Sequence, residues 1–230
     1  MKTLGVLGGM SWESTAVYYR LFNQGVRARL GGQHSAKLLL ASVDFAEIVA
    51  RQQAGDWRGA GQQLAELAAG LQNAGADAIL IATNTMHKVA DEIQAAVQVP
   101  LLHLVDATAE AVKAQGLATV GLLGTQFTMS DGFYSRRMQR QGVRTLVPSE
   151  TQRAEIHRVI FNELCLGRFE AEAKAYYLDV IEDLRTQGAE GVTLGCTEIG
   201  LLLKPEDCAL PLFDSAEIHA HSAVDFVLQC

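Results

Sequence analysis

The sequence predicts an α/β protein in which buried strands and amphipathic helices alternate. Short apolar runs rich in β-branched residues recur along the chain, and each leads through a glycine-rich or polar turn into a segment with helical periodicity. Regular alternation of this kind is typical of parallel sheets, whose strands are connected by helices. The chain's chemistry centres on residues 188–200, where an apolar run ends at Gly195 and Cys196 follows directly. Ligands of open α/β sheets bind at such carboxyl ends of strands.

The composition is that of an ordinary globular protein. The chain has 230 residues, of which 49% are hydrophobic and 20% charged, and its net charge is −7. This length allows one large or two small domains. Because there is no basic block, nucleic acid is excluded as the main partner. No apolar run reaches the length of a membrane span, and the run at 4–7 is too short for a signal peptide, so we expect a cytoplasmic protein without a membrane partner.

Neither the cysteines nor the histidines show the spacing of a metal site, and we expect no metal. His219 and His221 form a His-x-His pair near the end of an expected helix, without an acidic or cysteine partner in register. We interpret the pair as part of a solvated helix face. The chain has four cysteines, Cys165, Cys196, Cys208 and Cys230. In a chain without an export signal they should stay reduced. We interpret Cys208 and Cys230 as inert.

The amino-terminal part predicts a strand, a glycine turn and a helix. An apolar run at 3–7 leads through Gly8, Gly9 and Met10 to Ser11, a suitable N-cap for a helix at 12–30. Backbone N–H groups of such a turn can meet an anion, but the turn is not G-x-G-x-x-G, so no dinucleotide cofactor is predicted. Further strands are expected at 36–43, 76–82 and 100–105, with helices at 61–74 and from the 83–88 turn to about 97.

The second half of the chain resembles the first, which indicates an internal duplication. The matching stretches are 3–9 with 119–125, and 75–78 with 188–191. The second match has an offset of 113 (188 minus 75), and the same offset carries Thr83 onto Cys196. We therefore expect two similar domains that face each other across a cleft, with these two residues at equivalent strand ends. The expected domains are 1–98 plus 209–230, and 99–208.

Two proton-handling groups on opposite faces of one carbon are what stereoinversion requires. Cys196 is the expected base, because a thiol where a strand leads into a helix is shifted towards thiolate by the helix dipole. The planar carbanion and the charged groups of the substrate need hydroxyls, amides and N–H groups around them. Such groups gather at the predicted strand ends: Ser11, Asn84, Thr85, Thr125, Thr128 and Thr197.

Three motifs resemble the cofactor-independent aspartate/glutamate racemase superfamily, whose own motifs run Cys-Asn-Thr-x-His and Gly-Cys-Thr-Glu. They are Gly8-Gly9-Met10-Ser11, Thr83-Asn84-Thr85-Met86-His87 and Gly195-Cys196-Thr197-Glu198. The likeness runs through nearly the whole chain. It implies two Rossmann-like halves with the active site between them and a homodimer. It also implies a two-base mechanism on an amino acid, with no pyridoxal phosphate and no metal.

The chain departs from the family at the first catalytic position, where Thr83 replaces the usual cysteine. In this it resembles an atypical subgroup of racemases specific for L-aspartate and L-glutamate, which carries a threonine–cysteine pair. The resemblance implies that Cys196 removes the α-proton on the L-face. Thr83 is too weak an acid to exist as an alkoxide, so it would donate the opposite proton, directly or through water or His87. In that subgroup Met10, Gln52 and the turn at 83–85 would contact the substrate. With the strand-end groups and Glu198, the expected substrate contacts are Met10, Ser11, Gln52, Asn84, Thr85, Thr125, Thr128, Thr197 and Glu198.

A second departure concerns the side-chain carboxylate of the substrate. Aspartate racemases tend to supply a lysine within the segment at 161–167, where this chain has Cys165. Lys88, Arg51 or Arg153 would have to take its place, and the sequence does not choose among them.

Glu198 and His87 each allow two interpretations. Glu198 either contacts the substrate ammonium or relays a proton, or it complements the dipole of the following helix. Pointing at Cys196, its carboxylate would raise the pKa of the thiol. His87 either belongs to a second layer of the site together with Lys88, or it is a structural histidine.

Two other functions fit parts of the pattern. A decarboxylase of disubstituted malonates needs only one proton delivery, although the polar turn at 83–85 argues against a site for an aromatic substituent. A non-catalytic amino-acid sensor could have kept the fold, although the retained Cys196-Thr197-Glu198 argues against it. The variant Cys196→Ser separates the sensor, which should keep its binding, from an enzyme, which should lose turnover.

Overall fold

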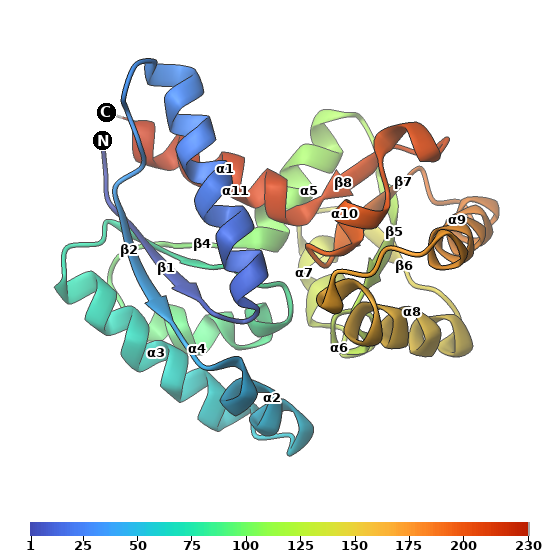
Figure 1. Cartoon of the computed structure of the whole chain (residues 1–230), viewed down its shortest axis with the longest axis horizontal. Helices are drawn as coiled ribbons and strands as arrows, with labels where there is room; N and C mark the ends of the chain where they lie inside the picture. Colours follow the sequence, from blue (N-terminus) through green and yellow to red (C-terminus); the bar gives the residue numbers. More distant parts are fainter. Residues whose placement is uncertain (230) are drawn as a thin grey trace. The chain divides into compact units, whose positions relative to one another are not determined.

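The computed structural model describes residues 1–229 and divides the chain into two compact units. The first unit holds Met1–Leu104 together with the carboxy-terminal stretch from His219, and the second holds Val105–Ile218. Each unit contains one four-stranded parallel sheet with helices on it (Figure 1). The predicted α/β class with two parallel sheets is therefore confirmed.

In the first unit the strand order is β2-β1-β3-β4, and all pairs are parallel. The strands are β1 (Leu4–Gly8), β2 (Leu38–Ser42), β3 (Ala78–Ile81) and β4 (Leu101–Leu102). The helices of this unit are α1 (Trp12–Leu30), α2 (Phe45–Gln53), α3 (Trp57–Asn73), the 3₁₀ turn η1 (Thr85–Val89), α4 (Ala90–Ala95) and most of α11 (Ser215–Leu228).

Helices cover both faces of this first sheet, as its continuous apolar strands require. On one face, Leu7 and Ile79 pack in a fully buried cluster with Ile48 of α2 and Leu64 of α3. On the other face, α1 and α11 approach closely, because a Cβ added at Gly25 of α1 would lie 3.0 Å from a methyl carbon of Val224. Figure 1 shows α1 and α3 on opposite sides of the β1–β2 pair.

In the second unit the strand order is β6-β5-β7-β8, again with parallel pairs only. The strands are β5 (Thr119–Gly124), β6 (Arg144–Leu146), β7 (Gly191–Gly195) and β8 (Leu212–Asp214). Strand by strand, this is the order of the first sheet, as the predicted duplication requires. The helical elements are α5 (Leu104–Ala114), α6 (Gln126–Ser130), α7 (Phe133–Arg140), α8 (Glu150–Asn162), η2 (Leu164–Leu166), α9 (Ala171–Thr186), α10 (Ile199–Leu202) and η3 (Pro205–Asp207).

Two local contacts fix helices of the second unit. Gly121 of β5 lets α9 approach, since a Cβ there would lie 2.8 Å from the Leu184 side chain. Arg137 of α7 donates two hydrogen bonds, of 2.7 and 2.6 Å, to the Asp106 carboxylate of α5. Such bidentate pairs hold two helices in one relative orientation.

The boundaries of the two units differ from the expected domains, 1–98 plus 209–230 and 99–208. Residues 209–218 belong to the second unit, because β8 pairs with β7 rather than returning to the first sheet. The strand expected at 100–105 is only two residues long, and α5 begins directly after it. Within residues 1–229, no helix combines the length and apolar character of a membrane span.

Candidate functional site

Each unit has one topological switch point, where ligands of open parallel sheets bind. In the first sheet the connections from β1 and from β3 run in opposite directions, so the carboxyl ends of these neighbouring strands form the switch point. The ends of β5 and β7 form it in the second sheet. We call residues 9–11 and 83–87 the first half-site, and residues 124–128 and 195–198 the second half-site.

The turn after β1 is built by glycine and by helix capping. Gly9 has a φ of 86°, which favours glycine, and a Cβ there would collide with the backbone of Val43. The Gly9 N–H donates to Thr15 Oγ1 at 2.8 Å. Ser11 is the N-cap of α1, as predicted, and its side chain accepts from the Ser14 N–H at 3.2 Å.

His87 holds the turn that carries Thr83. Its Nδ1 lies 2.8 Å from the Thr83 carbonyl oxygen, and its Nε2 accepts from the Leu104 N–H at 3.2 Å. Because Nε2 accepts, the ring proton is on Nδ1 and is donated to Thr83. Both ring nitrogens are therefore engaged by the backbone, and His87 is only 3% exposed. This geometry disfavours a proton relay through His87 and supports a positioning role.

Met10 and Gln52, both expected to contact substrate, are buried in the first unit. Met10 lies in the apolar cluster that also contains Met86. Gln52, on α2, donates from Nε2 to the Met86 sulfur at 3.2 Å. Asn84 and Thr85 are buried as well, with 6% and 8% exposure, whereas Thr83 is partly exposed.

The second half-site begins with two glycines opposite each other in the sheet register, Gly124 and Gly195. A Cβ at Gly124 would lie 3.0 Å from the Gly195 carbonyl oxygen, so a larger residue there would be tightly packed against the neighbouring strand end. Thr125 caps α6 by accepting from the Thr128 N–H at 3.3 Å, and the two hydroxyls are 3.1 Å apart. Thr125 thus occupies the place in the second unit that Ser11 has in the first.

Cys196, Thr197 and Glu198 form a compact hydrogen-bonded group after β7. The Cys196 thiol donates to Glu198 Oε2 at 2.9 Å, and the Thr197 hydroxyl donates to the same oxygen at 2.7 Å. The Cys196 residue is partly exposed, but its thiol lies in a densely packed part of the second unit. Desolvation therefore raises the thiol pKa well above its usual range, and the negative charge of Glu198 raises it further.

The expectation that a helix dipole shifts Cys196 towards thiolate is wrong for this structure. α10 begins only at Ile199 and is four residues long, so the thiol is not in its first turn. Burial and the Glu198 carboxylate act in the opposite direction and dominate. The thiol is held protonated, with a base already in contact.

The basic residues considered for a substrate carboxylate have different partners. Lys88 lies over the Trp57 ring, 3.8 Å from its centroid, and Arg51 is paired with Asp56 at 2.6 Å. The Arg153 Nε is buried and has no hydrogen-bond partner among residues 1–229. Cys165, in η2, forms no disulfide, and its charge contributes to raising the pKa of Cys196. Cys208 forms no disulfide either, and Cys230 lies outside the described residues.

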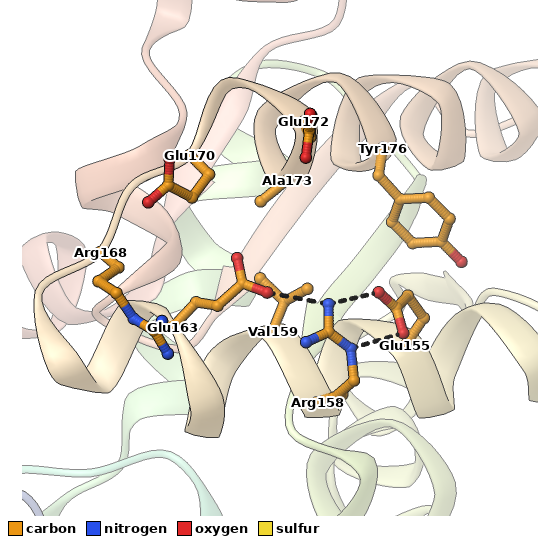
Figure 2. Close-up of a pocket in the computed structure, with 9 residues that line it drawn as sticks. All are labelled: Glu155, Arg158, Val159, Glu163, Arg168, Glu170, Glu172, Ala173 and Tyr176. Atoms are coloured by element: carbon orange, nitrogen blue, oxygen red, sulfur yellow. Dashed lines mark hydrogen bonds and ion pairs between the residues drawn. The ribbon is translucent and has the colours of Figure 1, made fainter.

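A surface pocket of about 480 Å³ lies in the second unit, between α8 and α9 (Figure 2). Arg158 bonds both Glu155, at 2.7 Å, and Glu163, at 2.9 Å, along its wall. None of the predicted site residues lines it; the lining residues are Glu155, Arg158, Val159, Glu163, Arg168, Glu170, Glu172, Ala173 and Tyr176.

Two histidines near the half-sites were not predicted to have roles. His157, on α8, accepts from the N–H of Gln126, directly after Thr125, at 3.3 Å. His219 was expected on a solvated face, but it is fully buried, at 0% exposure. Its helical spacing with the buried Ala216, Ala220 and Ala223 is the sequence signal that could have identified its inward orientation.

Comparison with known proteins identifies the family. A model of the Asp/Glu/hydantoin racemase family matches residues 7–223. The structure of a candidate Asp/Glu racemase from Yersinia pestis is 50% identical and covers 100% of both chains, with a TM-score of 0.95. An aspartate racemase homologue from Pyrococcus horikoshii OT3 is 36% identical over 100% of both chains, with a TM-score of 0.89.

A curated relative adds a third comparison. The broad specificity amino-acid racemase RacX of Bacillus subtilis (strain 168) is 26% identical over 158 residues, which are 69% of this chain and 68% of RacX. The family match spans both half-sites, including the ends of all four central strands. The chain belongs to the Asp/Glu/hydantoin racemase family, and it is an isomerase of the racemase type.

Proposed function

We propose that this enzyme racemises acidic amino acids, aspartate or glutamate, by moving the α-proton with its own side chains and without a cofactor. In this proposal the two half-sites act on opposite faces of one α-carbon. The observation that carries it is the equivalence of Thr83 and Cys196. Each residue follows the third strand of its unit, in sheets with the same strand order.

Cys196 is the proposed base on the L-face, with Glu198 as its partner. The thiol proton passes to the Glu198 carboxylate, which already accepts a hydrogen bond from the sulfur. The thiolate then takes the α-proton of the L-amino acid and leaves a planar carbanion. A positioned base of this kind contributes roughly 10²–10⁴ in rate. The Glu198 charge that keeps the resting thiol protonated thus also provides the proton acceptor.

Thr83 is the proposed donor on the opposite face. Its hydroxyl gives a proton to the carbanion and regains one from water. The hydroxide left behind is neutralised by the proton that Glu198 took from the thiol, so that the enzyme is restored and the reaction is a net inversion. A hydroxyl is a poor base in the reverse direction. Since the equilibrium constant of racemisation is one, kcat/KM must be equal for the two enantiomers. We therefore expect slow conversion in both directions, together with faster exchange of the L α-proton by Cys196.

The proposed substrate contacts are those expected from the family motifs and from the polar groups at the strand ends. Support for an acidic substrate comes from two similar structures, a candidate Asp/Glu racemase and an aspartate racemase homologue. The other substrate contacts remain predictions: Met10, Ser11, Gln52, Asn84, Thr85, Thr125, Thr128 and Thr197. A homodimer and a cytoplasmic location also remain predictions of the sequence, and light scattering on the purified protein tests the first.

Chiral chromatography of products tests the proposal. The protein, dialysed against a chelator and free of pyridoxal phosphate, is incubated with a panel of L-amino acids, and Cys196→Ser is the matched control. We expect D-aspartate or D-glutamate from the wild type and none from the variant. If only neutral amino acids gave product, the proposal of an acidic substrate would be overturned. Equal product from both proteins would overturn the role of Cys196.

A further inference from the structure

Three buried histidine rings lie together in the first unit, and one of them holds the Thr83 turn. The rings of His87 and His103 are 4.6 Å apart between centroids, and those of His87 and His219 are 5.6 Å apart. All three residues are at most 8% exposed. They come from η1, from the segment after β4 and from α11, so tertiary packing alone brings them together.

The hydrogen bonds of His219 determine its protonation. Its Nε2 lies 2.8 Å from the Leu102 carbonyl oxygen, which can only accept, so Nε2 carries the proton. Its Nδ1 lies 3.0 Å from the Tyr18 hydroxyl, and in the neutral ring this nitrogen accepts from Tyr18. Burial, together with the nearby His87, lowers the pKa of His219 to about 3, so the ring is neutral at ordinary pH.

The segment Leu102–His103–Leu104 connects His219 to His87. Its first carbonyl accepts from His219, and its last N–H donates to His87 Nε2 at 3.2 Å. Between these two bonds, the His103 ring packs against His87. Because this N–H fixes the tautomer of His87, it also makes His87 Nδ1 the donor to the Thr83 carbonyl.

From this network we infer that His219 is a positioning residue for Thr83: its donated hydrogen bond to Leu102 holds the segment that orients His87, which holds the Thr83 turn. The inference rests on the proposed function, in which Thr83 delivers the second proton. His219 itself touches no reacting atom. A displacement of the Thr83 turn should slow inversion without slowing proton removal by Cys196.

Two rates in D₂O separate these effects. The first rate is the uptake of α-deuterium by L-glutamate, which is measured by NMR and reports on Cys196. The second rate is the formation of D-glutamate, which is measured by chiral chromatography and also requires Thr83. His219→Leu removes both hydrogen bonds. His219→Gln keeps a donor at the place of Nε2, and His219→Asn keeps an acceptor at the place of Nδ1. His221→Gln, at an exposed position on the same helix, is the matched control.

We expect His219→Leu and His219→Asn to lower the ratio of inversion to exchange about tenfold or more, because small misplacements of reacting groups have large effects on rate. His219→Gln should restore the ratio to nearly the value of the wild type, and His221→Gln should not change it. An unchanged ratio in His219→Leu, or a ratio in His219→Gln as low as in His219→Leu, would overturn the inference. A failure of the proposed function looks different: Cys196→Ser would then exchange as fast as the wild type.

The tautomers give a readout that does not depend on how the variants fold. Spectra of the ¹⁵N-labelled wild-type histidines should show the ring proton of His219 on Nε2 and that of His87 on Nδ1. The opposite tautomer at either ring would contradict the network.

Discussion

The Cys196 sulfur and the Glu198 carboxylate are in direct contact, with 2.9 Å between Sγ and Oε2. Burial raises the pKa of the Cys196 thiol, and the Glu198 carboxylate in contact with it raises this pKa further. Thr197 donates to the same Glu198 oxygen and so fixes the carboxylate in place. The negative charge of Glu198 disfavours ionisation of the resting thiol, and in the proposed mechanism the same carboxylate accepts the thiol proton. This double role makes Glu198 the most informative position to change.

Glu198→Gln should separate the acidity of the thiol from its activity. Removing the negative charge lowers the pKa of Cys196, so the variant thiol should react faster with iodoacetamide at neutral pH. Deuterium exchange of the L-substrate should nevertheless fall roughly 10²-fold or more, because the proton acceptor is lost.

Both rates are measured on the same protein, with Glu206→Gln, in the exposed η3 turn, as the control. Faster alkylation accompanied by unchanged exchange would show that Glu198 only tunes the thiol.

Thr83→Cys should increase racemisation in both directions, because a thiol is a stronger acid than a hydroxyl and its thiolate is a competent base. Thr83→Ala should abolish formation of the other enantiomer and leave exchange of the L α-proton within a few-fold of the wild type. Chiral chromatography and NMR give the two rates. A Thr83→Ala protein that still interconverts the enantiomers at the wild-type rate would exclude Thr83 as the donor.

Burial of neutral His219 should make the protein sensitive to acid. Its pKa in the folded protein is about 3, below the value of about 6.5 expected on unfolding. The stability that this neutral ring provides is therefore complete above pH 6.5 and is lost as the pH falls from 6.5 towards 3. Each unit of pKa difference corresponds to about 1.4 kcal/mol.

Urea unfolding at pH 7 and pH 5 tests this, because His219→Gln has no ring to protonate. The free energy of unfolding should fall less in His219→Gln than in the wild type over this interval. Equal losses in the two proteins would mean that His219 is already protonated in the folded state, or is not buried.

Gly9→Ala should destabilise the protein far more than Gly31→Ala. Both glycines have positive φ, 86° and 71°, so alanine is strained at each by about 1 kcal/mol. Only at Gly9 would the added Cβ collide with backbone, that of Val43, whereas nothing lies within 4 Å at Gly31. Each variant's loss of unfolding free energy relative to the wild type is measured, and the difference between the two losses isolates the effect of the collision. Similar losses in the two variants would refute the tight turn before Ser11.

Local signals in the sequence were enough for the first strand–turn–helix unit. The helix expected at 12–30 is α1, and Ser11 caps it, because capping and helical periodicity depend on neighbouring residues only. The duplication was also visible, since an offset of 113 relates residues after equivalent strands. These features need no knowledge of how distant segments pack.

The errors concern properties that depend on tertiary contacts. The pKa of Cys196 depends on the orientation of the Glu198 side chain and on burial, neither of which the motif encodes. His219 was placed in solvent because its partners, Tyr18 and Leu102, are more than a hundred residues away in the sequence. The predicted domain boundary at residue 208 differs from the end of the second unit at Ile218, because the pairing of β8 with β7 is a long-range contact.

The most direct test of the two-sided mechanism compares the enantiomers in D₂O. L-glutamate and D-glutamate are incubated separately with the wild-type enzyme, and α-deuterium uptake and chirality are followed together. We predict that L-glutamate gains deuterium faster than it becomes D-glutamate, while D-glutamate exchanges only as slowly as it is inverted. Rapid and equal exchange from both enantiomers would contradict a thiol on one face and a hydroxyl on the other.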